Sequence, residues 1–327
     1  MRVASRSFAA LMPLRPAADL RRAANRHATT RTRETHVEKR IGFAGLGIMG
    51  SRMAANLLQR GFKLAVWNRE ADALRPLVDA GATPAPSPEA LAAQSDVVFS
   101  ILWDDEVSRE IVLGRMIPAA RAGTTFIEMS TISGAMQRRL GEAANERGCS
   151  FLAAPVTGSK EAAANGELTA LVAGPAAVLA AQRDVLSAVA AQVVHVGDYG
   201  TSAALKLGNN MLIGVLLGGL GESLRVTDAA GIDRRLALDT FIGTVARVAA
   251  MKRAAILERD WTPHFTVSAL EKDLRAAADA ALEADAVLPL LAATSELYKR
   301  LIDDGKGHRD FSIVADGTVP SEERATI

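Results

Sequence analysis

The stretch that decides the fold is IGFAGLGIMG, residues 41–50. It opens with a short apolar run of strand character, and apolar residues recur at helical spacing soon after it, at Met53, Ala54, Leu57 and Leu58. The order strand, GxGxxG, helix is the context in which this glycine pattern holds a dinucleotide. The sequence therefore predicts a strand–turn–helix unit that binds a dinucleotide at its turn.

Each glycine of the pattern has a separate physical task. Gly45 permits the tight turn out of the strand, Gly47 lets the backbone approach a pyrophosphate, and Gly50 allows the helix to pack closely on the strand. The phosphates then rest on the N–H groups and positive dipole end of the new helix. The predicted pyrophosphate-binding residues are Gly45, Leu46, Gly47, Ile48, Met49 and Gly50.

The second predicted strand, residues 63–67, ends in Asn68 and Arg69. A site for NAD usually carries an acidic residue here, which accepts a hydrogen bond from the ribose 2′-hydroxyl. Asn68 is neutral and the guanidinium of Arg69 suits a phosphate, so we expect NADP(H) to be preferred and NAD(H) to bind less well. The alternative is that Arg69 lies in solvent and Glu70 holds the ribose.

Strand-like and helix-like segments continue to alternate, which indicates an α/β domain with a Rossmann-type, doubly wound parallel sheet. Further strands are predicted at residues 97–102, 125–129, 151–154 and 170–173. The loops at the carboxyl ends of the first two, residues 103–105 and 130–131, should line the cofactor crevice. Leu102 and Thr131 are therefore counted among the cofactor-binding residues.

Between the last two predicted strands lies the loop PVTGSK, residues 155–160. It is rich in backbone N–H and hydroxyl donors, which suits it to hold a carboxylate. Thr157, Gly158 and Ser159 are the predicted substrate-binding residues of this loop. Without further context, an ordinary surface turn is the competing interpretation.

From Gly200 onward strand signals vanish, and long alanine- and leucine-rich segments have the period of a helix. Breaks are predicted near Gly231, Pro263, Pro289 and Gly305. We therefore expect residues 37–199 to form the NADP-binding domain and residues 200–327 an all-helical substrate and oligomerisation domain. The apolar run at residues 211–221 is too short to cross a bilayer, so we predict a buried helix and no membrane partner.

The first helix of this second domain carries Lys206 and Asn210, which are four residues apart and share one face. Both are surrounded by apolar residues. Desolvation lowers the pKa of a lysine toward the range that suits a general acid. Lys206 is therefore a candidate proton donor, although a lysine that extends from an apolar helix to solvent has the same spacing.

Composition narrows the class of protein. Hydrophobic residues make up 49% and charged residues 23% of the 327 residues, as in a folded globular chain. The lone Cys149 cannot form an internal disulfide, and the five histidines are scattered, so we expect a small buried cysteine and no metal site. No basic stripe marks the predicted domains, which argues against a nucleic-acid partner.

Residues 1–36 differ from the rest of the chain, because they hold eight arginines against Asp19 and Glu34. This is the composition of an organellar transit peptide. The alternative is a mis-assigned start, since the predicted fold begins at Val37. We expect an unstructured extension in either case, with an organellar matrix or stroma location in the first and a cytoplasmic one in the second.

Three motifs together resemble the β-hydroxyacid dehydrogenase family, which includes 3-hydroxyisobutyrate, tartronate semialdehyde and 6-phosphogluconate dehydrogenases. They are GLGIMGSRMAANLL (45–58), APVTGSKEAAANGELTALVAG (154–174) and GDYGTSAALKLGNNM (197–211), in the order of the family. The segments GSK (158–160), VWNR (66–69) and FTVSALEKDLRAA (265–277) most resemble the glyoxylate and succinic semialdehyde reductase branch, which is NADPH-linked.

The resemblance implies roles for single residues. Lys206 matches the catalytic lysine and Asn210 the asparagine that orients lysine and substrate. Thr157 and Gly158 match the binders of the substrate carboxylate, and Thr131 a residue beside the nicotinamide. The residues that match those closing over the site are Phe265, Lys272 and Asp273; we expect Lys272 to contact the cofactor and the other two the substrate.

Two positions depart from the family pattern. Ala153 stands where relatives often have an acid, and Ser202 replaces the third glycine of a GxxGxG turn. These departures bear on the choice of substrate and on turn geometry.

The implied reaction is hydride transfer from NADPH to a small aldehyde acid, glyoxylate or succinic semialdehyde, with Lys206 as proton donor. Three alternatives remain open. They are oxidation of the 3-hydroxyisobutyrate or tartronate semialdehyde type, imine reduction, and an inactive dinucleotide-binding module. A homo-oligomer through the helical domain is also expected.

Overall fold

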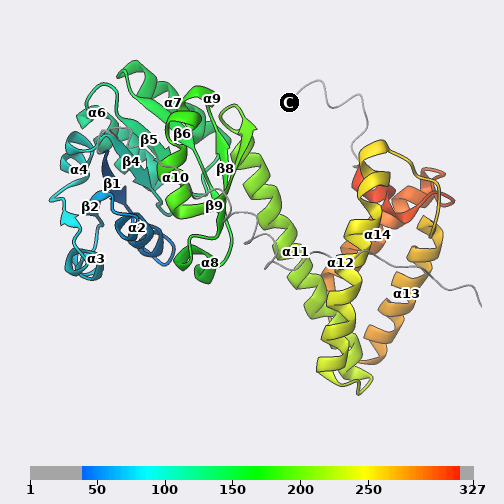
Figure 1. Ribbon diagram of the computed structural model, residues 1–327. Helices are drawn as coiled ribbons and strands as arrows, with labels where there is room; N and C mark the ends of the chain where they lie inside the picture. The colour runs from blue at the N-terminus through cyan, green and yellow to red at the C-terminus, as the bar shows by residue number, and fades with distance from the viewer. Residues whose placement is uncertain (1–38, 317–327) are drawn as a thin grey trace, which may run out of the picture. The chain divides into compact units, whose positions relative to one another are not determined.

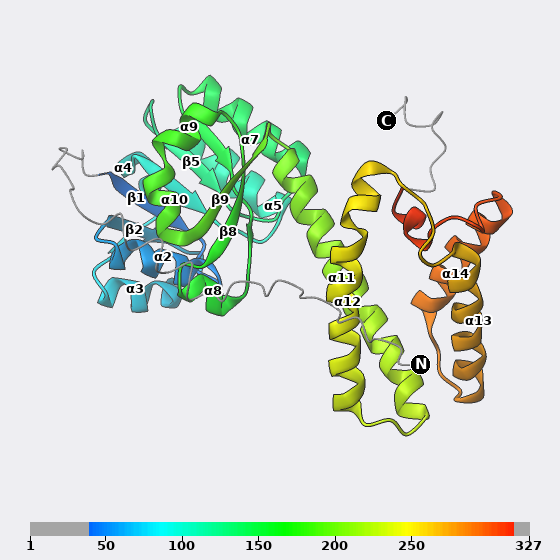
Figure 2. The same cartoon turned by 45° about the vertical axis from the view of Figure 1, so that its right-hand side comes forward.

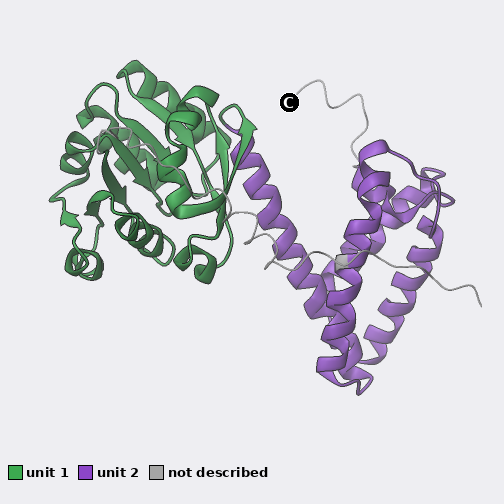
Figure 3. Ribbon diagram, viewed as in Figure 1, with its two compact units in different colours: residues 1–199 green, residues 200–327 purple. Residues whose placement is uncertain are grey.

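The computed structural model describes residues 39–316, so the predicted extension at residues 1–36 lies outside the described part. The chain divides into two compact units, residues 1–199 and 200–327 (Figure 3). The boundary falls directly before α11 (Thr201–Ala229).

Unit 1 is built on one sheet of nine strands (Figure 1). Its strand order is β3-β2-β1-β4-β5-β6-β8-β7, and β9 pairs with β8. The strands are β1 (Arg40–Ala44), β2 (Lys63–Trp67), β3 (Thr83–Pro84), β4 (Val97–Ser100), β5 (Thr125–Glu128), β6 (Ser150–Ala153), β7 (Val156–Thr157), β8 (Leu168–Ala173) and β9 (Ala190–Gly197). The first six run parallel, which confirms the doubly wound sheet predicted from the alternating pattern.

The far side of the sheet is mixed, which the sequence did not predict. β8 runs antiparallel to both β6 and β7, and β9 runs parallel to β8. Residues 155–160 were predicted to be a loop, but Val156 and Thr157 pair with β8 as β7. Two-residue strands such as β3 and β7 are too short to show periodicity, so their pairing is decided by the neighbouring strand.

Helices pack on both faces of the sheet because alternate strand residues point to opposite sides. Phe43 and Phe99 belong to one buried cluster, and Val98 and Phe126 to the other. The helical segments of unit 1 are α2 (Gly50–Gln59), η2 (Ala71–Leu74), α3 (Arg75–Asp79), α4 (Pro88–Gln94), α5 (Asp105–Ser108), η3 (Arg109–Met116), α6 (Ile117–Ala119), α7 (Gly134–Glu146), α8 (Lys160–Ala164), α9 (Ala176–Ala181) and α10 (Arg183–Val189).

In its described part, unit 2 is helical apart from one isolated β-bridge between Thr266 and Asp310. After α11 come α12 (Arg234–Glu258), α13 (Val267–Glu283), α14 (Pro289–Asp303) and η4 (Phe311–Asp316). α13 packs against α14, as Figure 2 shows. The helix breaks fall where Gly231, Pro263, Pro289 and Gly305 predicted them.

Two side chains fix helix ends within unit 2. The Asp233 carboxylate caps α12 by accepting from the Leu236 N–H at 3.0 Å. The buried Glu222 on α11 accepts from the first-turn N–H groups of α14, at Leu290 and Leu291, both at 2.8 Å. A carboxylate at a helix N-terminus is stabilised by the helix dipole, so Glu222 joins α11 to α14.

The prediction that residues 211–221 form a buried helix is right about the helix and wrong about its burial in the single chain. Met211 is 69% and Leu217 59% exposed in α11. By length and composition alone, α11 is also apolar enough to cross a membrane. The sequence placed these residues on a helix correctly but could not show whether another part of the chain covers it.

Candidate functional site

The glycine turn has the geometry that a pyrophosphate requires. Gly45 has a φ of 93°, and a Cβ there would lie 2.2 Å from the Ile101 carbonyl oxygen. A Cβ on Gly50 would lie 2.0 Å from the Gly45 oxygen. A Cβ on Gly47, in contrast, would meet no protein atom within 4 Å. Gly45 and Gly50 are thus required by packing within the chain, whereas Gly47 borders open space.

The helix that follows the turn, α2, has an N-terminus that suits an anion. α2 has no side-chain cap and no acidic residue in its first turn. Its N–H groups and the positive end of its dipole are therefore not offset by a carboxylate of the same turn. Ile48 is 69% exposed, so the middle of the turn borders solvent.

Asn68 has a structural contact that the sequence did not predict. Its Oδ1 accepts from the Leu46 N–H at 2.9 Å, and its Nδ2 donates to the Glu70 carboxylate at 2.9 Å. Asn68 therefore holds the glycine turn in place from the end of β2. Because the Glu70 carboxylate already accepts from Asn68, that contact competes with the alternative in which Glu70 holds the ribose.

Arg69 presents its charge to solvent. Its side chain is 61% exposed and lies 3.9 Å from the carboxylate of Glu110, which is itself 60% exposed. An exposed ion pair at this distance contributes little to stability. The guanidinium is therefore available to a ligand phosphate at low cost.

The loops after β4 and β5 lie at the carboxyl edge of the sheet, next to the glycine turn. β1 and β4 are neighbours, and the Ile101 N–H donates to the Ala44 carbonyl at 3.0 Å. The Leu102 N–H donates to Ser130 Oγ at 2.6 Å. Thr131 follows and is exposed. Ligands of such sheets bind where the strand order reverses, and in this sheet that point lies between β1 and β4.

The loop predicted to hold a carboxylate is ordered by its own hydrogen bonds. Gly158 has a φ of 138°, and a Cβ there would lie 2.7 Å from a methyl carbon of Leu168. Ser159 caps α8, its Oγ accepting from the Ala162 N–H at 3.2 Å. Thr157 is partly exposed on β7. That Thr157, Gly158 and Ser159 bind substrate stays a prediction.

In unit 2, Lys206 lies on the second turn of α11 and is half-buried. Burial lowers the pKa of the Lys206 ammonium from its usual value of 10.5. This is the shift that the apolar neighbours of Lys206 predicted. Asn210, one turn further on, is exposed.

The sequence reasoning passed over Asn209. Its Nδ2 is buried and has no hydrogen-bond partner among residues 39–316. A buried polar atom without a partner is energetically costly, which makes Asn209 a further candidate for contact with a ligand. The signal was present in the sequence as Asn209-Asn210, three and four residues after Lys206.

The remaining predicted residues lie around the start of α13. Phe265 is 39% exposed and packs edge-on against Phe311, with ring centroids 5.9 Å apart. Lys272 and Asp273 are exposed neighbours whose charged groups are 2.8 Å apart. Asp310 holds the loop before α13 in place. Its Oδ2 accepts from the His264 N–H at 2.9 Å and from Lys252 Nζ at 2.8 Å.

The Lys252–Asp310 ion pair was not predicted. Its side chains are 4% and 1% exposed, and Lys252 Nζ lies 4.9 Å from the centroid of the Phe311 ring. Burial alone would raise the pKa of Asp310, but hydrogen bonds from Lys252 and Ser312 outweigh it and hold that pKa well below its usual range. The partners are 58 residues apart, and no spacing rule connects them.

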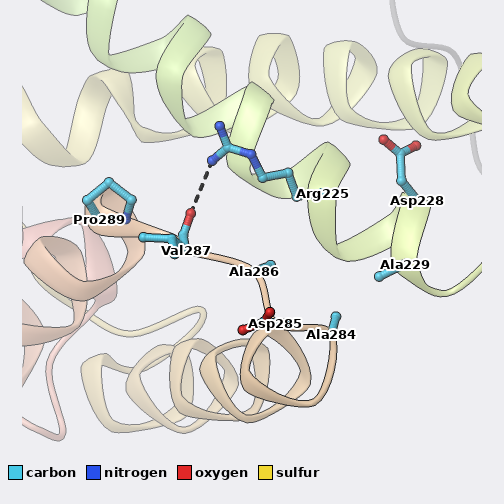
Figure 4. A pocket seen from close by; sticks show the side chains of 8 residues that line it. All are labelled: Arg225, Asp228, Ala229, Ala284, Asp285, Ala286, Val287 and Pro289. Atoms are coloured by element: carbon cyan, nitrogen blue, oxygen red, sulfur yellow. Dashed lines mark hydrogen bonds between the residues drawn. The ribbon is translucent and has the colours of Figure 1, made fainter.

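A separate pocket lies at the other end of unit 2 and contains none of the predicted site residues (Figure 4). Arg225 Nη1 donates to the Val287 carbonyl at 3.2 Å across it. The residues that line it are Arg225, Asp228, Ala229, Ala284, Asp285, Ala286, Val287 and Pro289.

Comparison with known proteins gives two family matches that together span almost all described residues. Residues 40–197 match the NAD binding domain of 6-phosphogluconate dehydrogenase. Residues 200–316 match the model described as NAD-binding of NADP-dependent 3-hydroxyisobutyrate dehydrogenase.

Similar proteins include two curated relatives and one solved structure. Glyoxylate/succinic semialdehyde reductase 2, chloroplastic, of Arabidopsis thaliana is 30% identical over 90% of this chain and 84% of its own length. The mitochondrial 3-hydroxyisobutyrate dehydrogenase of Drosophila melanogaster is 31% identical over 85% and 89%. The imine reductase of Myxococcus stipitatus in complex with NADP+ has a TM-score of 0.78 over 85% of this chain and 99% of its own, but at 22% identity it shows the fold alone.

Proposed function

The chain belongs to the β-hydroxyacid dehydrogenase family, and from this premise we propose that it reduces small carboxylate-bearing aldehydes, such as glyoxylate and succinic semialdehyde, with NADPH. Family membership makes it a nicotinamide-dinucleotide-dependent oxidoreductase. The choice of aldehyde and of NADPH is the proposal.

The observation that carries the proposed chemistry is Lys206. Bound NADPH supplies the hydride in this reaction. The carbonyl oxygen then becomes an alkoxide, and the Lys206 ammonium donates a proton to it. Burial lowers the pKa of Lys206, which makes the ammonium a stronger acid than a lysine in water. Asn210, on the same helix face, orients the lysine and the substrate oxygen.

Substrate and cofactor selection rest on other groups. The donors of Thr157, Gly158 and Ser159 hold the substrate carboxylate, and Phe265 and Asp273 complete the substrate contacts. Arg69, with Asn68 beside it in place of an acid, binds the 2′-phosphate of NADPH. Lys272 contributes a second cation to the cofactor.

A second candidate reaction is the oxidation of 3-hydroxyisobutyrate or a related 3-hydroxy acid. The similarity to the Drosophila melanogaster dehydrogenase supports it. This oxidation would use the same residues, with neutral Lys206 acting as a base instead of an acid. The two candidate reactions therefore share the lysine and differ in the preferred substrate and in the direction of hydride transfer.

Steady-state assays separate the candidates. We expect the highest kcat/KM with glyoxylate or succinic semialdehyde and NADPH, a lower value with NADH, and a lower one still for oxidation of 3-hydroxyisobutyrate. Higher kcat/KM with 3-hydroxyisobutyrate would replace the proposal by the second candidate. A cyclic imine as the best substrate would contradict both.

We also propose that a second copy of this chain covers the exposed apolar residues of α11 and α12. Large apolar patches on a soluble protein mark contact sites. Both helices carry them, and α12 also carries interspersed charges that a lipid interior would reject. The most exposed large apolar residues of the two helices are Met211, Leu212, Leu217, Leu236, Ile242, Met251 and Leu257.

Light scattering after gel filtration tests this proposal. We expect a mass above the 34.4 kDa of one chain. Leu217→Glu should shift the protein toward a monomer, while Leu282→Glu, on α13 at an 82% exposed leucine, should not. A monomeric wild type, or protein recovered only with membranes and detergent, would contradict a second copy as the cover.

A further inference from the structure

Glu128 is a buried carboxyl group that the proposed reaction does not use. It ends β5 beside the carboxyl end of β4, where Ser100 is its direct neighbour in the parallel register. Glu128 is 1% and Ser100 0% exposed. A carboxyl group is rarely placed so deep in an apolar sheet without partners, so its hydrogen bonds indicate what it does.

The hydrogen bonds of Glu128 join the ends of two strands. Its Oε2 accepts from Ser100 Oγ at 2.6 Å, and its Oε1 accepts from the Ser130 N–H at 2.9 Å. Ser130 in turn accepts from the Leu102 N–H through Oγ at 2.6 Å. The chain of contacts therefore runs from β5 through Ser130 to the backbone of the loop after β4.

Burial raises the pKa of Glu128, and hydrogen bonds from Ser100 and Ser130 act against that shift. Burial is the larger influence, so the pKa of Glu128 stays raised and these hydrogen bonds only reduce the shift.

Both segments that Glu128 holds border the proposed cofactor site. Leu102 follows Ile101, whose carbonyl oxygen lies against the glycine turn, only 2.2 Å from where a Cβ on Gly45 would be. Thr131 follows Ser130. A fixed spacing between these two loops preorganises a binding site, because no ordering has to occur when the ligand arrives.

We propose that Glu128 is a positioning residue for the dinucleotide: through Ser130 it fixes the loops after β4 and β5 at the spacing that the cofactor requires. It touches neither cofactor nor substrate. The proposal rests on dinucleotide binding at the glycine turn and is independent of which aldehyde is reduced.

Direct titration of NADPH and of NADH against the full chain, without turnover, tests the proposal. We expect Glu128→Gln and Ser130→Ala each to raise both dissociation constants about tenfold or more, since small displacements of binding groups have effects of this order. The double variant should be scarcely weaker than either single variant, because both changes interrupt the same chain of contacts.

A matched control lies at the opposite end of the same strand. The Thr125 hydroxyl accepts from Gln182 Nε2 at 3.2 Å and is equally buried. Thr125→Val should lower the melting temperature but leave both dissociation constants within about twofold, as a change remote from the site would.

Three results would overturn the proposal. One is that Glu128→Gln and Ser130→Ala lower the melting temperature while both cofactors bind as in the wild type. Another is that Thr125→Val weakens binding as much as they do, which would make the effect general destabilisation. If Glu128→Gln does not fold, Ser130→Ala and Ser100→Ala are measured in its place. The third contrary result is that both of these variants bind the cofactors as the wild type does. Wild-type protein that binds both cofactors but reduces no small aldehyde acid would instead count against the proposed function and leave the positioning role of Glu128 untouched.

Discussion

The two units bury their apolar side chains to different extents. Unit 1 encloses two buried clusters, one on each face of its sheet, with aromatic residues such as Phe43 and Phe126 fully buried. The described part of unit 2 has one small cluster, of Val267, Tyr298, Leu301 and Ile313, while α11 and α12 expose large apolar side chains. Among the described residues, unit 1 therefore buries most of its large apolar side chains in its own core, whereas α11 and α12 of unit 2 leave many of theirs exposed.

The two units also differ in how far the polar groups near the candidate site are hydrogen-bonded. In unit 1 they order the glycine turn and the loops beside it, as Asn68 and Ser130 do. In unit 2 Asn209 has a buried amide nitrogen without a described partner, and Lys206 is half-buried. The candidate cofactor residues of unit 1 are thus held by hydrogen bonds within the described chain, whereas the candidate proton donor lies on a helix with an unpartnered buried amide.

The largest expected effect is on kcat, and it tests whether unit 2 supplies the proton donor while unit 1 binds the cofactor. Lys206→Ala should lower kcat by about 10²- to 10⁴-fold, the usual contribution of a general acid. The NADPH dissociation constant should stay unchanged, because Lys206 is not among the residues proposed to bind the cofactor. Lys299→Ala, at an exposed lysine of α14, is the control and should keep full turnover. Equal loss of NADPH binding in Lys206→Ala would show that the units do not divide the work in this way.

The pH profile sharpens the same prediction. A lysine donates a proton only while it is protonated, so kcat/KM for reduction should be high at low pH and fall as the pH rises through the pKa of Lys206. Because burial lowers that pKa, the fall should begin below the usual lysine value of 10.5. The limb should be missing from the residual activity of Lys206→Ala.

The next largest effect concerns the stability of unit 2. Asp310→Asn should cost about 3–5 kcal/mol, because it leaves the Lys252 ammonium buried without a counter-ion. Urea unfolding followed by the fluorescence of Trp261 in unit 2 measures this. Lys252→Met combined with Asp310→Leu should be less destabilised than Asp310→Asn.

The sign of the pH dependence follows from the lowered pKa of Asp310. A carboxyl group with a depressed pKa contributes stability that is present above its unfolded value of 3.8 and is lost as the pH falls below it. We therefore expect acid to destabilise wild-type unit 2 more than the Asp310→Asn variant. Parallel acid unfolding of the two would show that the ion pair is not the cause.

A smaller effect separates the two tasks of the glycines in unit 1. Gly47→Ala should raise the NADPH dissociation constant by about tenfold, or 1.4 kcal/mol, and leave the melting temperature unchanged, because its Cβ meets no protein atom. Gly50→Ala should lower the melting temperature, since its Cβ would lie 2.0 Å from the Gly45 oxygen. A destabilised Gly47→Ala protein would remove the evidence for open space at the turn.

The smallest effect concerns cofactor choice. Arg69→Gln should reduce the preference for NADPH over NADH by about tenfold, because one charge-assisted contact to the 2′-phosphate contributes an energy of that order. Arg75→Gln, at a 76% exposed arginine of unit 1, is the matched control. An unchanged ratio of the two dissociation constants in Arg69→Gln would favour Glu70 as the ribose contact.

Local patterns were sufficient for much of the fold and for the glycine turn. The strand at residues 63–67 matches β2 residue for residue, and the breaks at Gly231 and Pro289 separate helices as expected. The tasks of Gly45 and Gly50 were also predictable, since a tight turn and a close helix have local sequence signatures. The short strands β3 and β7 were not, because their pairing depends on neighbours distant in the chain.

The amino-acid sequence by itself determined the order of strands and helices, the glycine turn and the position of Lys206, since each depends on residues close together along the chain. The tertiary structure alone decided which distant groups meet, as Glu128 with Ser100 and Lys252 with Asp310 do. It also decided which apolar helices stay exposed. Periodicity reports the face of a helix that avoids water, but only packing determines what covers that face.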